Sequence, residues 1–141
     1  MAWITYAMGT AVALAAADFF IKLAAGKLSN SLALLLYGSC TFLTGLAWVL
    51  LDRARGVEIY AQTSAVLAAI GVGVAFSAVT VGLYMTFVAG APISLASPFV
   101  RLGGLLIASL TGLFLLHEPF TWRYAVGMVL AVSGVYLIIT R

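Results

Sequence analysis

Five long apolar stretches dominate this sequence and leave little chain for any other kind of structure. They cover residues 2–25, 31–51, 64–89, 93–116 and 122–140. Each is close to the ~20 residues that a helix needs to cross the hydrocarbon core of a bilayer. None shows the strict apolar/polar alternation of a membrane-barrel strand. Outside a barrel, a lipid-exposed backbone must be helical, because its peptide groups find hydrogen-bond partners only within the segment. We therefore predict an all-α membrane protein with five transmembrane helices.

Composition excludes a water-soluble fold. Apolar residues make up 65% of the chain and charged residues only 8%, whereas about a quarter of a soluble domain is charged. The first stretch follows no basic segment and is too long for a typical signal-peptide core, so we interpret it as a helix. The longest polar stretch, residues 52–63, is too short for a separate domain. We expect residues 1–141 to form one multi-pass domain of the inner (plasma) membrane.

The basic residues bear on partners and on orientation. They are scattered singly near helix ends, so we expect no nucleic-acid binding. Cytoplasmic loops normally collect Lys and Arg. Here the two sides tie when Arg101, inside a span, is set apart. One side carries Arg53, Arg55 and Arg123, and the other carries Lys22, Lys27 and Arg141.

The tie has two interpretations. In the first, other signals fix a single orientation despite the weak bias. In the second, the chain inserts in both orientations, and two copies associate as an inverted homodimer. Such a dimer reproduces in two chains the inverted repeats of many transporters.

Arg101 is the strongest candidate for a binding residue. It follows Ser94, Ser97 and Pro98 and lies about two turns inside its span. An arginine at this depth either faces a cavity or snorkels to the interface, which is ~12 Å away at Ile93. In a cavity, its planar fork suits a carboxylate or a phosphate, which favours a substrate with an anionic group. The candidate substrate-binding residues are Arg101, Ser97, Ser94, Tyr84, Thr80 and Ser77.

Asp18 and Lys22 stand four residues apart and can meet on one face of the first helix. The favoured interpretation is a self-neutralised pair near the helix end, in which Lys22 snorkels. The alternative makes Asp18 a carboxylate that couples transport to protons or cations, released from Lys22 when Arg101 competes for it.

Hydroxyl groups mark one face of two other helices. Ser77, Thr80 and Tyr84 do so on the third, and Tyr37, Thr41 and Thr44 on the second. Such hydroxyls usually hydrogen-bond between helices, and a smaller share line a solute cavity.

Small residues at four-residue spacing predict close helix contacts, within or between chains. They are Gly104, Ala108 and Gly112 on the fourth helix and Gly127 and Ala131 on the fifth.

The remaining reactive residues predict no chemistry. The lone Cys40 is expected to pack, and His117 and Glu118 to form a capped turn. No cluster of metal-ligand residues and no nucleophile–base pair is visible. We expect no enzymatic activity, metal or cofactor.

The C-terminal half carries motifs of a known family. They are Gly90-Ala91-Pro92, the Pro98 helix, residues 115–119 (LLHEP) and residues 127–135 (GMVLAVSGV). The chain resembles a single EamA-type five-helix repeat of the drug/metabolite transporter superfamily. The match is closest from about Gly71 onward. Ten-helix members hold two such repeats in inverted orientation, so the resemblance implies that a lone repeat pairs with a second copy.

The first helix resembles the small multidrug resistance proteins of the same superfamily. Residues 19–22 (FFIK) are similar to the end of their first helix, and residues 31–51 form an added helix. Leu14 stands near the place where those proteins carry a proton- and drug-binding glutamate. This departure argues against export of lipophilic cations.

Functions from different classes follow, and a dedicated ion channel ranks third after two others. The first is a small homodimeric transporter of an organic metabolite or lipid-linked headgroup, working by alternating access in the bilayer. The second is an accessory membrane subunit of a heteromeric complex, in which Arg101 and Asp18 only pair in an interface.

Dual insertion makes a direct prediction. Cysteines introduced at Ser29 and Gly56, in the first two loops, should each react with a membrane-impermeant maleimide from both sides of the membrane. Reaction of each cysteine from one side only would contradict dual insertion.

Overall fold

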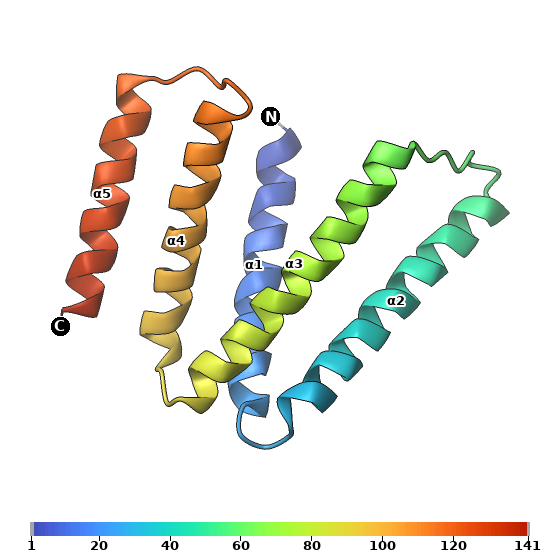
Figure 1. Cartoon of the computed structure of the whole chain (residues 1–141), viewed down its shortest axis with the longest axis horizontal. Coiled ribbons are helices and arrows are strands. Elements are labelled where there is room, and N and C mark those ends of the chain that lie inside the picture. Colours follow the sequence, from blue (N-terminus) through green and yellow to red (C-terminus); the bar gives the residue numbers. More distant parts are fainter. Residues whose placement is uncertain (1, 141) are drawn as a thin grey trace. The chain divides into compact units, whose positions relative to one another are not determined.

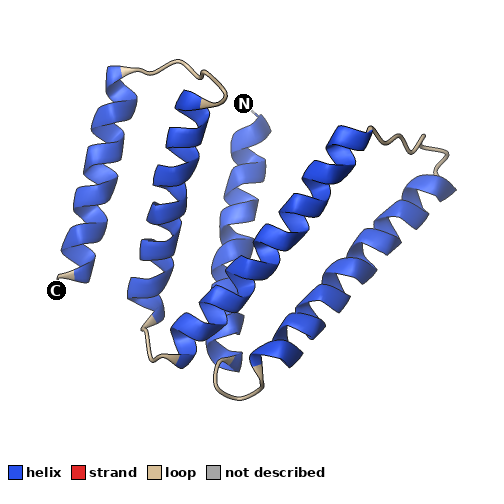
Figure 2. Ribbon diagram, viewed as in Figure 1, coloured by secondary structure: helices blue, strands red, loops and turns tan. Residues whose placement is uncertain are grey.

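The computed structural model describes residues 2–140, which form five α-helices and, within that range, no strand (Figures 1 and 2). All five helices are long and apolar enough to cross a membrane. The predicted all-helical class and the number of helices are confirmed for this range. The helices are α1 (Ala2–Ala24), α2 (Asn30–Ala54), α3 (Thr63–Val88), α4 (Ile93–Phe114) and α5 (Trp122–Ile139).

The observed helix boundaries differ from the predicted ones by at most three residues, and three of the five helix starts agree. The largest difference is at α2, which continues beyond Leu51 to Ala54. An apolar run marks the part of a helix that suits hydrocarbon, whereas the helix itself continues to a backbone stop signal. Here the stop is Gly56, at a φ of 72°. The N–H groups of Gly56 and Val57 donate to the carbonyls of Arg53 and Asp52 at 3.2 and 3.0 Å, a Schellman arrangement.

The end of α4 has a different construction. The helix stops at Phe114, two residues earlier than predicted. His117 has a φ of 55° and is the only non-glycine residue with a positive φ in the described range. The Glu118 N–H donates to the Gly112 carbonyl at 3.0 Å. The Glu118 carboxylate folds onto the same glycine, so that a Cβ at Gly112 would lie 2.7 Å from Oε2.

The chain divides into two compact units, the first ending at Ala89 and the second beginning at Gly90. In the first unit α3 contacts both α1 and α2, and Figure 1 shows α2 running beside α3. The buried apolar side chains of this unit are Ala33, Leu83 and Phe87. Two polar side chains, Asp18 and Thr80, are buried as well. The centre of this unit therefore combines apolar and polar groups.

The second unit consists of α4 packed against α5. The Tyr124 hydroxyl on α5 donates a hydrogen bond to Ser109 Oγ on α4. The Tyr124 ring also lies edge-on to Phe120, with 6.5 Å between centroids. Thr121 caps α5 by accepting from the Tyr124 N–H at 3.3 Å. Thr121 thus caps the start of α5, and the Tyr124 side chain joins α5 to α4.

Most large apolar side chains of the described residues are exposed, and none is completely buried. Phe114 and Leu137, for example, are 75% and 69% exposed. Soluble monomers rarely expose apolar patches of this extent, whereas helices in a bilayer do so over their whole length. The exposure is compatible with a multi-pass membrane protein.

The small-residue positions are largely open. A Cβ at Gly104 or Gly127 would meet no atom within 4 Å. Neither glycine therefore lies in a close contact between helices of the described chain. Gly112 is covered by Glu118 rather than by another helix. Contacts between chains at Gly104, Ala108, Gly127 and Ala131 stay a prediction.

Two details refine the labelling experiment on topology. A cysteine at Gly56 would be strained by its positive φ, and the exposed Glu58 in the same loop is the better position. Cys40 is exposed, so a Cys40→Ser background removes its signal. Arg141, one of the residues in the charge comparison, lies outside the described residues.

The Tyr124–Ser109 hydrogen bond predicts a stability effect. Tyr124→Phe should lower the free energy of unfolding by ~0.5–1.5 kcal/mol, because the ring stays while the contact between helices is lost. Thermal unfolding in detergent measures the change. Tyr136→Phe is the matched control, since its side chain on the same helix is 65% exposed. Equal stability of the Tyr124 and Tyr136 variants would show that the bond contributes nothing.

Candidate functional site

Three polar residues, together with the aromatic ring that Lys22 contacts, mark the region where α1 contacts α3. We call this set, Asp18, Lys22, Thr80 and Phe87, the polar seam. Asp18 is 4% exposed and Thr80 7% exposed. Lys22 Nζ lies 5.3 Å from the centroid of the Phe87 ring, a distance typical of a cation–π contact. Thr80, Leu83 and Phe87 follow one another at helical three- and four-residue spacing and form the buried face of α3.

Asp18 stands about one turn before Lys22 on α1, and both helices of the seam run in the same direction. In Figure 1 both α1 and α3 run from the top of the view to the bottom. Lys22 and Phe87, which form the cation–π contact, lie near the C-terminal ends of these helices. Asp18 precedes Lys22 by about one turn, Leu83 precedes Phe87 by about one turn, and both Asp18 and Leu83 are buried.

Burial of Asp18 is the most informative property of the seam. A carboxylate in apolar surroundings is stable only when it is paired, protonated or bound to a cation. Asp18 lies about 9 Å along the helix from the end of α1 at Ala24, a depth that its short side chain does not span. The contact of Lys22 with Phe87 was not foreseen by either interpretation of the Asp18–Lys22 spacing. The residues next to Lys22 in the sequence are apolar, like those of any transmembrane helix, and gave no sign of the contact with Phe87.

The hydroxyls expected to join helices bond within their own helices instead. Thr80 Oγ1 donates to the Phe76 carbonyl and Ser77 Oγ to the Gly73 carbonyl, both at 2.8 Å. Thr41 and Thr44 likewise donate to carbonyls four residues earlier. The expectation of interhelical bonds is wrong for these four residues, because the carbonyl one turn back is the nearest acceptor. Their oxygens keep lone pairs that can accept from a ligand.

The α4 candidates present a mixed picture. Ser94 and Arg101 are exposed, and Ser97 is half-buried. Ser97 Oγ is buried without a hydrogen-bond partner in the described range. The helix continues through Pro98. Ser77, Thr80 and Tyr84 belong to the first unit, whereas these α4 residues belong to the second, so a site shared by both sets stays a prediction.

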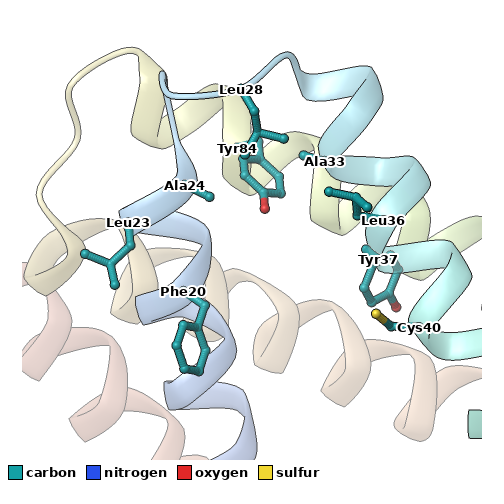
Figure 3. A pocket seen from close by; sticks show the side chains of 9 residues that line it. All are labelled: Phe20, Leu23, Ala24, Leu28, Ala33, Leu36, Tyr37, Cys40 and Tyr84. Carbon is teal, nitrogen blue, oxygen red and sulfur yellow. The ribbon is translucent and has the colours of Figure 1, made fainter.

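The first unit contains a pocket of about 470 Å³ between α1, α2 and α3 (Figure 3). Of the predicted substrate-binding residues, only Tyr84 lines it. Tyr37 also lines it, as does Cys40, which we had expected only to pack. The apolar lining residues, such as Phe20 and Leu23, gave no signal in the sequence because they look like any other residue of a transmembrane helix.

No group of three or more His, Cys, Asp or Glu side chains in residues 2–140 could hold a metal ion. The chain matches no protein-family model, and no curated protein or solved structure is significantly similar to it.

Proposed function

We propose that the chain is a small multi-pass transporter of the inner membrane that moves an organic metabolite or lipid-linked headgroup by alternating access. The observation that carries this proposal is the burial of Asp18 in a helix long and apolar enough to cross a membrane. Ionisable residues inside such helices are costly and typically mark ion or substrate pathways.

A purely structural role explains Asp18 less well. Two apolar side chains at the same place would pack without any desolvation cost, and replacing a buried ion pair by apolar groups is often neutral or stabilising. A transporter, in contrast, needs a group whose charge can be neutralised in turn by protons, cations or substrate. Asp18 and the nearby Lys22 provide such a group on one helix.

The family proposal rests on the C-terminal motifs and on the five-helix length. We assign the chain to the drug/metabolite transporter superfamily as a single EamA-type repeat. The tie of loop charges and the odd number of helices support an inverted homodimer. The open faces at Gly104 and Gly127 are suited to close contact with a second copy.

Reconstitution tests the proposal. A thermal-shift screen of metabolites, including organic acids and organic phosphates, should find a solute that stabilises the protein, because a ligand of the folded state raises the melting temperature. Proteoliposomes that contain this chain alone should then exchange that solute. Stabilisation without any exchange would favour the accessory subunit instead.

Asp18→Asn should separate coupling from binding. The amide keeps the size of the side chain but cannot take up a proton or bind a cation as a carboxylate does. Equilibrium exchange of the solute should persist, whereas accumulation driven by a proton or sodium gradient should be lost. Asp52→Asn, at the end of α2, is the matched control and should accumulate solute normally. Normal accumulation by Asp18→Asn would remove Asp18 from the mechanism.

Arg101 should recognise an anionic group on the substrate. Arg101→Ala should weaken solute affinity roughly ten- to hundredfold, the loss of one charge-assisted hydrogen bond. Arg101→Lys should express and assemble normally but bind more weakly than the native protein, because an ammonium lacks the planar fork. Isothermal titration measures both variants. Unchanged affinity in Arg101→Ala would identify Arg101 as a snorkelling residue.

A further inference from the structure

We propose that the pocket between α1, α2 and α3 binds an uncharged amphipathic molecule from the bilayer, with an apolar body and a hydroxyl or carbonyl group. This site goes beyond the proposed transport function, because the ligand is neutral and the pocket lies within the first unit. The proposal does not require that the chain transports anything.

The size and lining of the pocket suit a small ligand. Its volume of about 470 Å³ falls within the range of known small-molecule sites, which are mostly apolar with a few placed polar groups. Three helices contribute to it. Phe20 and Leu23 come from α1, Leu36 and Tyr37 from α2, and Tyr84 from α3. The aromatic rings offer flat apolar surfaces to a chain or a ring.

Three side chains with polar atoms line the pocket. Figure 3 shows the Tyr37 hydroxyl beside the Cys40 sulfur on α2 and the Tyr84 hydroxyl on α3, and all three residues line the pocket. Neither tyrosine hydroxyl has a hydrogen bond within residues 2–140. A phenol hydroxyl in apolar surroundings without a hydrogen-bond partner destabilises the folded protein. A ligand with one hydroxyl or carbonyl oxygen would supply that partner.

The charge of the lining selects a neutral ligand. No Asp, Glu, Lys, Arg or His lines the pocket. An ion that entered from water would lose its hydration and find no opposite charge, at a cost of several kcal/mol. The anionic substrate expected at Arg101 is therefore not the ligand of this pocket.

The pocket is accessible from outside the first unit, because lining residues of α1 and α2 are exposed. Leu36 and Tyr37 are 54% and 36% exposed, so the pocket is open rather than enclosed. In a bilayer these exposed side chains would face the acyl chains, where an uncharged amphipath concentrates. Both a membrane lipid and a free solute can supply the same chemistry.

Cys40 makes the site measurable in the native protein. It is the only cysteine of the chain and it lines the pocket, so its alkylation by N-ethylmaleimide reports occupancy. The full chain is placed in phosphatidylcholine nanodiscs with octan-1-ol, octanoate or octyltrimethylammonium, which share one chain and differ in head-group charge. Octan-1-ol should slow alkylation in a saturable manner, and the two ions should do so much less. Equal slowing by all three probes, or by none, would overturn the proposal.

Tyrosine variants locate the binding. Tyr84→Phe and Tyr37→Phe should each weaken the apparent affinity for octan-1-ol about two- to tenfold, the value of one neutral hydrogen bond. Tyr136→Phe on α5 is the matched control and should not change it. Melting temperatures verify the folding of each variant. If one of the two pocket variants is unstable, the other still tests the proposal. Native affinity in both pocket variants would refute the role of the hydroxyls and with it the proposed site.

The two sources of ligand are distinguished in the same assay. Dioleoylglycerol incorporated in the nanodisc protects Cys40 when the natural ligand is a membrane lipid. Protection by octan-1-ol and not by dioleoylglycerol indicates a small free solute. Either pattern supports a neutral amphipath, and failure of both probes refutes it whether or not the chain transports a metabolite.

Discussion

Satisfaction of backbone and side-chain hydrogen bonds in apolar surroundings is the constraint on which the rest of this structure depends. With 65% apolar residues, the chain has few polar side chains to meet peptide groups, so helices must do so internally. The same constraint acts on the hydroxyls. Ser77 and Thr80, for example, donate to carbonyls four residues earlier in α3. The few polar side chains that do not bond within their own helix are therefore the best indicators of a binding site.

These groups separate into two chemically different places in the first unit. Asp18 and Lys22 bring ionisable groups to the contact of α1 with α3, where Lys22 lies over the Phe87 ring. Tyr37, Tyr84 and Cys40 bring neutral polar atoms to a pocket that no charged residue lines. An ion and a neutral amphipath require opposite surroundings, so the two places suit different ligands. The proposed ionic site and the proposed amphipath pocket therefore both lie in the first unit.

Helix ends depend on backbone signals more than on hydropathy. Gly56 ends α2 through a left-handed residue, and His117 adopts a similar φ after α4. The apolar runs located the helices to within three residues but could not locate these stops, because a helix can continue through polar residues such as Asp52 and Arg53. Open glycines at Gly104 and Gly127 show that a small-residue pattern predicts the possibility of contact and not the partner.

The sequence by itself determined the number, approximate limits and apolar character of the helices, because each follows from a continuous run of about 20 residues. It also identified Asp18, Lys22 and Tyr84 as unusual polar residues in such runs. Only the tertiary structure decided that Asp18 is buried, that Lys22 rests on Phe87 and that Tyr84 shares a pocket with Tyr37 and Cys40. The reason is physical. Hydropathy is a property of each segment alone, whereas burial and pocket lining depend on which faces of different helices meet, and apolar faces of transmembrane length are too similar to specify that meeting from their pattern.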